Sequence, residues 1–325
     1  MTDIPITLAC ADYARLAPLM TGDVKPDGIE LTLVHGTGGS WPARAEMLQR
    51  ALQDPGVHGG EASMAGHLRR IDQGDRRFLA LPVFPLRNFT GRDLYIRKGG
   101  PVTDAAELIG KRVDMYDWVA SGSIWYRHFL NFIGVAPERL EWWIGDVEDG
   151  WRARHPGALP DGVHAVPEGR FLVEMLIAGD LEAIYSPPRP SRYDAAAGPI
   201  VRLFPDFRVI ERDYFRQTGM FPPQHLVVIR REVWERDKSI AGRLTDAFSR
   251  ANRLFAEAQR NFPYVSPWLE AELEETEALM GADFYADGFE RNRSTIDVFC
   301  RQAHELGITS RLIAAEEYFA EFLDG

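Results

Sequence analysis

The sequence predicts an α/β protein of two lobes with a group of helices at its C-terminal end. Strand and helix patterns alternate along two blocks of the chain, which is typical of mostly parallel sheets covered by helices. The blocks are separated at Lys98-Gly99-Gly100-Pro101, and an apolar run over residues 226–229 follows the second block. A continuous apolar run indicates a strand buried on both faces. We therefore interpret this run as the return of the chain to the first lobe, and 325 residues fit two such domains.

The first block begins with an alternating strand pattern. We expect strands over residues 4–9, 29–34 and 78–84, and helices over residues 13–21, 41–52 and 64–72. Between them, the glycine-rich segment His58-Gly59-Gly60-Glu61-Ala62-Ser63 is expected to form a loop.

The second block repeats the alternation. We expect a short helix near Ala105, strands over residues 112–116, 141–144 and 181–185, helices over 123–133 and 171–178, and a surface loop over 145–169. Helical periodicity then predicts helices over residues 240–258, 269–280, 292–306 and 315–322. The first lobe is expected to comprise residues 1–94 and 221–325 and the second lobe residues 95–220, so that two chain crossings form a hinge.

The charge and the cysteine content exclude several functions. A formal net charge of -11 argues against nucleic acid, whose phosphates require a basic surface. Two cysteines cannot form a disulfide framework or a zinc site of several thiolates. Neither a signal-peptide pattern nor a run of about twenty apolar residues occurs, so we expect no membrane association and a cytoplasmic location. The sequence leaves open a homo-oligomer.

Ligands of open α/β sheets bind beyond the carboxyl ends of the strands, and ligands of two-lobed proteins bind between the lobes. His225 lies between a Pro-Pro turn and the apolar run, where an imidazole with a pKa near neutrality suits proton transfer. It could instead be a hydrogen-bonded packing residue. The candidates for this cleft are His225 and Glu61 as catalytic residues and Tyr13, Ser63, Arg87, Arg92, Ser121, Gly122, Ser123 and Arg127 as substrate-binding residues.

The arginines and the serine turn suggest that the ligand is an anion. Arg87 and Arg92 could hold carboxylates bidentately or form salt bridges across the lobes. The Ser121-Gly122-Ser123 turn precedes a predicted helix, so it is either an anion site shared with Arg127 or a simple N-cap. Glu61 could orient His225, hold a substrate hydroxyl or cap the helix that follows it.

Several motifs occur in the order expected for a known family. They are ITLACADY at residues 6–13, Glu61-Ala62-Ser63, GSIWYR at residues 122–127 and LFPDF at residues 203–207, together with the segments around Arg87 and His225. With these motifs the chain resembles the 4,5-dihydroxyphthalate decarboxylase family, which implies the fold of type 2 periplasmic binding proteins. One position departs from the family pattern, because Gly91 stands where the resemblance leads us to expect a histidine.

The resemblance implies a carboxy-lyase that removes CO2 from a hydroxylated aromatic carboxylate such as 4,5-dihydroxyphthalate. His225 would supply the proton, Glu61 would polarise the ring hydroxyl, and Arg87 with the turn from Ser121 to Arg127 would bind the carboxylate that stays. The chemistry requires no cofactor, and a divalent metal is left open. Two alternatives are a binding protein without chemistry, which Gly91 supports, and a lyase like the menaquinone-pathway enzymes that share the fold.

Overall fold

The computed structural model describes residues 3–36, 41–150, 159–263 and 265–325. The chain divides into two compact units, one formed by residues 1–88 and 221–325 and the other by residues 89–220. Residues 89–94, which we expected in the first lobe, fall in the second unit. The chain crosses between the units at Asn88–Phe89 and again at Met220–Phe221.

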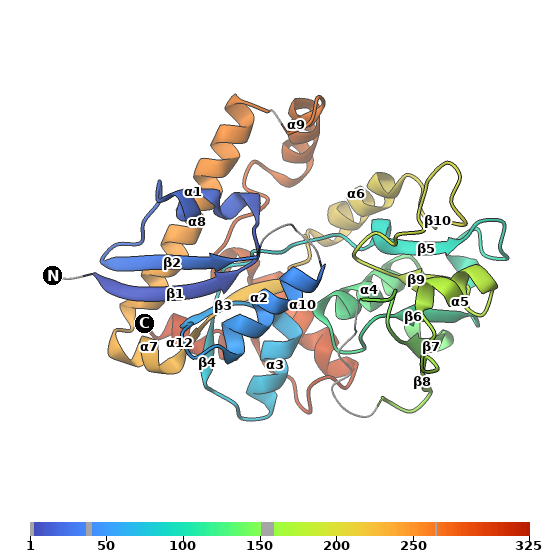
Figure 1. The fold of residues 1–325 in the computed structure, drawn as a ribbon, viewed down its shortest axis with the longest axis horizontal. Helices are drawn as coiled ribbons and strands as arrows, with labels where there is room; N and C mark the ends of the chain where they lie inside the picture. Colours follow the sequence, from blue (N-terminus) through green and yellow to red (C-terminus); the bar gives the residue numbers. More distant parts are fainter. Residues whose placement is uncertain (1–2, 37–40, 151–158, 264) are drawn as a thin grey trace. The chain divides into compact units, whose positions relative to one another are not determined.

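The first unit is built on a five-stranded sheet in the order β2-β1-β3-β11-β4 (Figure 1). Its strands are β1 (Ile4–Cys10), β2 (Ile29–His35), β3 (Gly59–Ser63), β4 (Phe78–Leu81) and β11 (His225–Arg230). Strand β1 is parallel to β2 and β3, whereas β11 is antiparallel to β3 and β4. The apolar run is therefore a strand of the first unit, buried along Leu226–Ile229 as its sequence indicates.

Strand β3 corrects the sequence analysis, which made Gly59–Ser63 part of a loop. Gly59 and Gly60 both have positive φ, and a Cβ on either residue would collide with the carbonyl oxygen of Val228 or of Ala9 on a neighbouring strand. Glycine permits both the backbone conformation and the close approach of β1 and β11. The same two residues look like a loop in the sequence because glycine has a low intrinsic preference for strands.

Helices cover both faces of this sheet. They are α1 (Ala17–Thr21), α2 (Trp41–Gln53), α3 (Met64–Asp72), α7 (Arg231–Arg236) and α8 (Ser239–Asn261). Leu244 and Phe248 of α8 pack with Ile6 and Leu8 of β1 in the main core. The buried residues of α8 recur at helical spacing only as far as Ala251, so its last turns leave the core.

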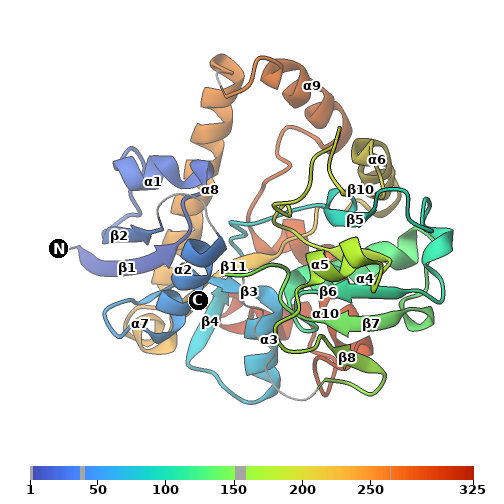
Figure 2. The same cartoon turned by 45° about the vertical axis from the view of Figure 1, so that its right-hand side comes forward.

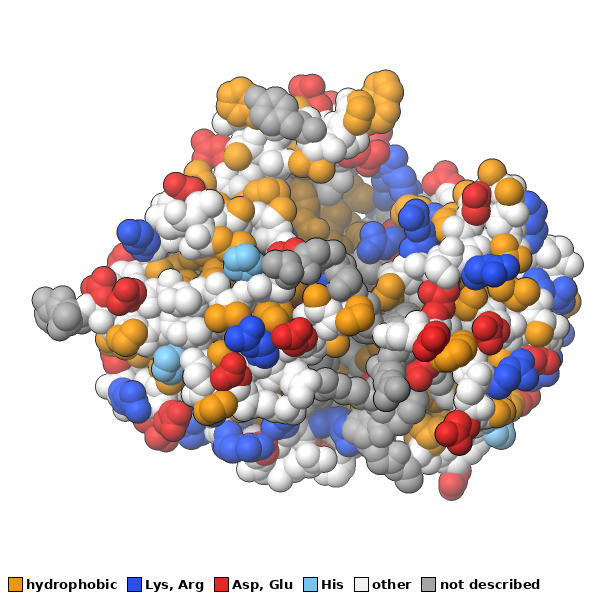
Figure 3. Space-filling model, in the orientation of Figure 1, with side chains coloured by type: hydrophobic (Ala, Val, Ile, Leu, Met, Phe, Trp, Pro, Cys, Tyr) orange, Lys and Arg blue, Asp and Glu red, His pale blue; other side chains and the backbone are white. Residues whose placement is uncertain are grey.

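Beyond the core, α8 leads to α9 (Leu269–Met280), which has no buried residue (Figures 1 and 2). Apolar side chains are exposed at this end of the unit, among them Phe262, Val265 and Trp268, and Figure 3 shows apolar groups there. Every helix of the described residues is too short or too polar to cross a lipid bilayer.

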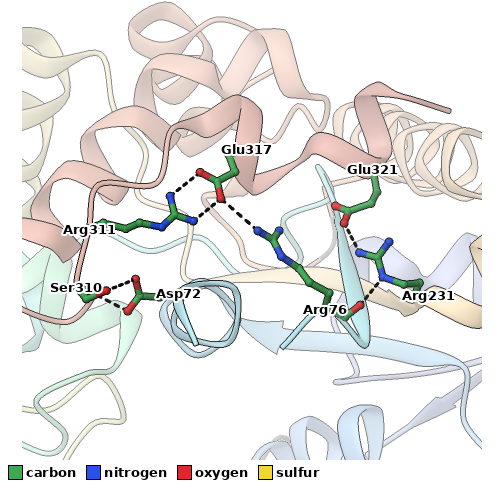
Figure 4. Close-up of polar contacts among 7 residues, drawn as sticks. All are labelled: Asp72, Arg76, Arg231, Ser310, Arg311, Glu317 and Glu321. Atoms are coloured by element: carbon green, nitrogen blue, oxygen red, sulfur yellow. Dashed lines mark hydrogen bonds and ion pairs between the residues drawn. The ribbon is translucent and has the colours of Figure 1, made fainter. Parts of the chain in front are cut away.

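The C-terminal helices belong to the first unit. They are α10 (Phe289–Glu305), α11 (Ala315–Tyr318) and α12 (Ala320–Leu323). Figure 4 shows how the segment from Ser310 to Glu321 is fastened: Ser310 bonds Asp72, Glu317 accepts from Arg311 and Arg76, and Glu321 accepts from Arg231. Tyr318 also donates to the carbonyl of Met64 at 2.7 Å, so the end of the chain is anchored to the start of α3.

The second unit is built on a six-stranded sheet in the order β10-β5-β9-β6-β7-β8. Its strands are β5 (Leu94–Arg97), β6 (Arg112–Met115), β7 (Glu141–Ile144), β8 (Val163–Ala165), β9 (Ala183–Tyr185) and β10 (Ile200–Arg202), and its helices are α4 (Ser121–Phe132), α5 (Leu172–Ala178) and α6 (Phe207–Thr218). Strands β6 to β9 are mutually parallel, and β5 runs antiparallel to β9 and β10. Each of the two predicted blocks therefore forms a sheet of its own.

Candidate functional site

Glu61 and His225 meet because of the register between β3 and β11. In this antiparallel pair Val227 lies opposite Glu61 and His225 lies opposite Ser63. Directly opposed residues share a face of the sheet, and so do residues two apart along one strand. Glu61 and His225 are thus diagonal neighbours on one face, and the imidazole Nδ1 hydrogen-bonds the Glu61 Oε1.

Every acceptor atom of the Glu61 carboxylate is engaged by the protein. Its Oε2 accepts from the backbone N–H of Ala11 at 2.9 Å, and its Oε1 accepts from the hydroxyl of Tyr13 at 2.6 Å as well as from His225. Glu61 as a whole residue is 1% exposed. It therefore has no free face toward a ligand, and its contacts are those of a group that orients the tyrosine and the imidazole.

These contacts keep Glu61 ionised despite its burial. Burial alone would raise its pKa, but the charge and hydrogen bond of His225, together with the bonds from Tyr13 and Ala11, lower the pKa below the ordinary value. The same carboxylate and burial raise the pKa of Tyr13 well above its usual value, so Tyr13 is a neutral phenol and a donor. Burial and the charge of Glu61 also raise the pKa of the Cys10 thiol, which makes it a poor nucleophile.

The tautomer of His225 follows from its partner. A carboxylate only accepts hydrogen bonds, so Nδ1 must carry the proton that it shares with Glu61. Nε2 is then the nitrogen that can exchange a proton with a ligand, and within the described residues no group bonds it. The side chain is 15% exposed, against 2% for that of Glu61. This is the arrangement by which a buried carboxylate holds an imidazole for acid/base chemistry.

Ser63 and Arg87 serve the protein's own structure. The Ser63 hydroxyl caps α3 by accepting from the N–H of Gly66 at 3.3 Å, so Ser63 and not Glu61 is the cap. The buried guanidinium of Arg87 donates to the carbonyls of Phe221 and Ala286 at 3.0 and 3.2 Å and to Asn292 at 2.6 Å. Burial lowers the pKa of Arg87 to about 10. These contacts favour a structural role, in which Arg87 ties the crossing segment to the C-terminal helices.

The remaining predicted binding residues lie in the second unit. Arg92 is exposed and pairs with Asp93 at 3.4 Å. Ser121, Gly122 and Ser123 are buried in the first turn of α4, and the N-cap is Ala120, so neither serine is the N-cap.

Arg127 folds back onto the start of its own helix. Its guanidinium donates to the carbonyls of Ser123 and Trp118 at 3.0 and 2.7 Å and lies 4.2 Å from the centroid of the Trp118 ring. Burial lowers its pKa to about 9. The structure thus groups Arg127 with the Ser121–Ser123 turn, as the spacing in the helix predicts, while two of its donors are used within the chain.

Gly91 is closely surrounded by side chains. A Cβ there would lie 3.2 Å from Cγ of Glu211 and 3.3 Å from atoms of Ile210 and Phe129. Glu211 accepts from the N–H of Arg92 at 2.9 Å, and burial raises its pKa to about 7. Sequence reasoning missed Glu211, since nothing local marks a residue of α6 as the neighbour of residue 91.

Arg44 is a second residue that the sequence analysis missed. It lies in the first turns of α2, half-buried, with its guanidinium carbon 5.0 Å from the centroid of the Tyr13 ring. In the sequence it is one of several charged residues in a helical pattern, and only the contact with Tyr13 distinguishes it. Within the described ranges, no three His, Cys, Asp or Glu side chains are grouped closely enough to bind a metal ion.

Comparison with known sequences identifies relatives over nearly the whole chain. The 4,5-dihydroxyphthalate decarboxylase of Comamonas testosteroni is 28% identical over 326 residues, covering 98% of this chain and 97% of the relative. The enzyme of the same name from Pseudomonas putida is 27% identical over 220 residues, 66% of this chain and 83% of the relative. No protein-family model matches the chain. The resemblance to the 4,5-dihydroxyphthalate decarboxylase family is confirmed.

Comparison with solved structures confirms the predicted fold. The periplasmic aliphatic sulphonate-binding protein SsuA of Escherichia coli aligns with a TM-score of 0.54 at 11% identity, covering 98% of this chain and all of the other. A putative periplasmic sulfonate-binding protein SsuA of Methylobacillus flagellatus KT aligns with a TM-score of 0.55 at 11% identity, covering 100% of this chain and 95% of the other. The chain has the fold of the periplasmic binding proteins.

Proposed function

We propose that this relative of the 4,5-dihydroxyphthalate decarboxylases is a carboxy-lyase that removes CO2 from a hydroxylated aromatic carboxylate. The observation that carries the proposal is the buried, ionised Glu61 bonded to Nδ1 of His225, which leaves Nε2 as the position for proton exchange. The names of the two relatives support the substrate class. We place the reaction in the cytoplasm, which cell fractionation would test.

The proposed reaction exchanges one carboxylate for one proton. The imidazolium of His225 donates its Nε2 proton to the ring carbon that bears the carboxylate, and a ring hydroxyl para to that carbon gives up its proton as it becomes a carbonyl. The bond to the carboxylate then breaks, its electron pair restores the aromatic ring, and CO2 leaves. The hydroxyl regains a proton and the imidazole is reprotonated from solvent, so that no oxidant or reductant is needed.

Glu61 has a positioning role in this proposal. Its carboxylate stabilises the imidazolium, since opposite charges in a buried site interact strongly. The sequence leaves three roles open for Glu61, and the resemblance implies that it polarises the substrate hydroxyl, but both of its oxygens already accept hydrogen bonds from Ala11, Tyr13 and His225. We therefore propose that it orients His225 and Tyr13 and does not touch the substrate.

The test is CO2 release from 4,5-dihydroxyphthalate and from hydroxylated benzoates, with three forms of the protein. Wild type should form product, and His225→Gln should turn over roughly 10² to 10⁴ times more slowly while it still binds ligand, because an amide replaces one neutral hydrogen bond but cannot donate the proton. His35→Gln is the matched control, an exposed histidine of the same sheet. Normal turnover by His225→Gln would end the acid role.

A binding protein without chemistry is the second candidate. The fold is that of sulphonate-binding proteins, and Gly91 stands in place of the histidine expected from the resemblance. On this hypothesis, aromatic carboxylates would raise the melting temperature of the wild type while no CO2 is released from any of them. Product formation that is lost in His225→Gln would exclude it.

A further inference from the structure

Arg44 is a cation whose guanidinium contacts the ring of Tyr13, a member of the Tyr13–Glu61–His225 cluster. Among the described residues, no carboxylate forms an ion pair with it, and its recorded contact is with the ring of Tyr13. Arg50, two turns further along the same helix, pairs with Asp54 at 3.5 Å.

The charge of Glu61 does not explain Arg44. Glu61 is bonded by His225, by Tyr13 and by the N–H of Ala11, and these groups account for the lowering of its pKa. The guanidinium carbon of Arg44 lies 5.0 Å from the centroid of the Tyr13 ring, and its charge lowers the pKa of Tyr13 against the larger effects of burial and of Glu61. The carboxylate of Glu61 is therefore balanced by His225 and by hydrogen bonds. The guanidinium of Arg44 has no carboxylate partner among the described residues and could bind an incoming anion.

The chemistry of a guanidinium suits an incoming carboxylate at this position. The N–H donors of a guanidinium lie in one plane, where they match the two oxygens of a carboxylate. Its partial burial strengthens such a bond compared with one in bulk water. Arg87, which the sequence analysis chose for this role, is buried and bonded to Phe221, Ala286 and Asn292.

We propose that Arg44 binds the carboxylate that the substrate retains, while His225 faces the carbon that loses CO2. The inference rests on the proposed function for the identity of the substrate, and it deepens that function by assigning a second, non-reacting carboxylate. It implies that the site takes aromatic dicarboxylates, and that Tyr13 links the two halves of the site by donating to Glu61 and contacting Arg44.

The test is calorimetric binding of phthalate, which has both carboxylates but lacks the hydroxyl that the proposed reaction needs. Arg44→Gln should raise the Kd for phthalate by roughly 10- to 100-fold, the loss of one charge-assisted carboxylate bond. Arg44→Lys should recover part of the affinity, because it restores the charge without the planar fork. Arg50→Gln is the control from the same helix and should bind like the wild type.

The outcomes separate this inference from the proposed function. With 4,5-dihydroxyphthalate, Arg44→Gln should raise KM and leave kcat within a few-fold, since the retained carboxylate is held equally in the ground and transition states. Equal phthalate affinity in Arg44→Gln and the wild type, or no binding to either, would overturn the role of Arg44 even if CO2 is released. Absence of CO2 release together with Arg44-dependent phthalate binding would overturn the decarboxylase and leave this inference standing.

Discussion

Glu61 of the first unit and Glu211 of the second are both buried, at 1% and 7% exposure, yet their protonation is driven in opposite directions. The pKa of Glu61 is lowered, because the charge of His225 and three hydrogen bonds outweigh burial. Burial raises the pKa of Glu211 to about 7, since its partners are mainly the backbone N–H groups of Arg92 and Gly91. A hydrogen-bonded cation, more than burial, therefore decides which buried carboxyl stays charged.

Two other carboxyls, that of the buried Asp114 and that of the half-buried Asp287, agree with this comparison. Burial raises the pKa of Asp114 well above its ordinary value, although its Oδ1 accepts from the N–H of Tyr185 at 3.0 Å. Asp287 lies in the first unit and accepts from Phe84 and Asn252, yet burial raises its pKa too. The difference thus belongs to the partners of each carboxyl and not to the unit in which it lies.

The largest expected effect is on the turnover of a variant that lacks the charge of Glu61. Glu61→Gln keeps the size of the side chain but removes the charge that stabilises the His225 imidazolium. Turnover of 4,5-dihydroxyphthalate should fall roughly 10²-fold or more, within the range lost when general acid catalysis is impaired. Steady-state kinetics on the folded variant measure it. Unchanged kcat would show that the compensated carboxylate has no part in the reaction.

Glu211→Gln should affect the protein in the opposite way to Glu61→Gln. Turnover should stay unchanged, and the free energy of unfolding should rise by an amount that depends on pH. The folded-state pKa of Glu211, about 7, lies above the ordinary value of 4.5, so its contribution to stability is full below pH 4.5 and is lost as the pH rises through 7. A glutamine side chain does not ionise, so the variant does not lose stability as the pH rises. The variant should match the wild type near pH 4.5 and exceed its free energy of unfolding by about 1 to 3 kcal/mol at pH 8.

Urea unfolding at pH 5 and pH 8 measures this difference, with Glu61→Gln as the matched comparison. Glu61 has a lowered pKa, so its contribution is present above pH 4.5 and is lost as the pH falls through the folded-state pKa. Its Gln variant should therefore be less stable than the wild type at pH 8. If both variants shift stability in the same direction at pH 8, the contrast between the two carboxyls is wrong.

The sequence indicates the fold more fully than the site. Alternating strand and helix patterns predict two sheets, and the apolar run after His225 predicts β11, because these signals depend on local periodicity. Local periodicity does not predict strand β3. Its residues Gly59 and Gly60 are glycines because Val228 and Ala9 of the neighbouring strands approach them closely, and these two residues are distant in sequence. The pairing of Glu61 with His225 could be raised as a hypothesis, but it needs the register of β3 and β11.

Arg44 and Arg87 show most clearly how far the sequence alone can identify a binding residue. Arg87 stands in a motif-like segment and Arg44 in an ordinary helical pattern, so the sequence favours Arg87 as the carboxylate ligand. Their roles depend on what surrounds each guanidinium: Arg87 meets two carbonyls and Asn292, whereas Arg44 meets the ring of Tyr13. Composition and spacing contain no information on these partners, which are 31 to 205 positions away in the sequence.

The smallest effect concerns the packing around Glu211, at the residue that departs from the family pattern. Gly91→Ala places a Cβ 3.2 to 3.3 Å from Glu211, Ile210 and Phe129, so these groups must move by a few tenths of an ångström. We expect a cost of about 1 kcal/mol, the lower end for overpacking a buried site. Gly242→Ala in α8 is the control: nothing lies within 4 Å of its Cβ, and alanine favours a helix by up to about 1 kcal/mol. The pH dependence of this loss separates a steric from an electrostatic cause. Because the expected strain is steric, urea unfolding should give the same loss of stability for Gly91→Ala at pH 5 and at pH 8. A loss that appears only at pH 8 would instead mean that residue 91 acts through the charge of Glu211, and an undiminished stability would mean that the surrounding side chains move aside without cost to admit a Cβ.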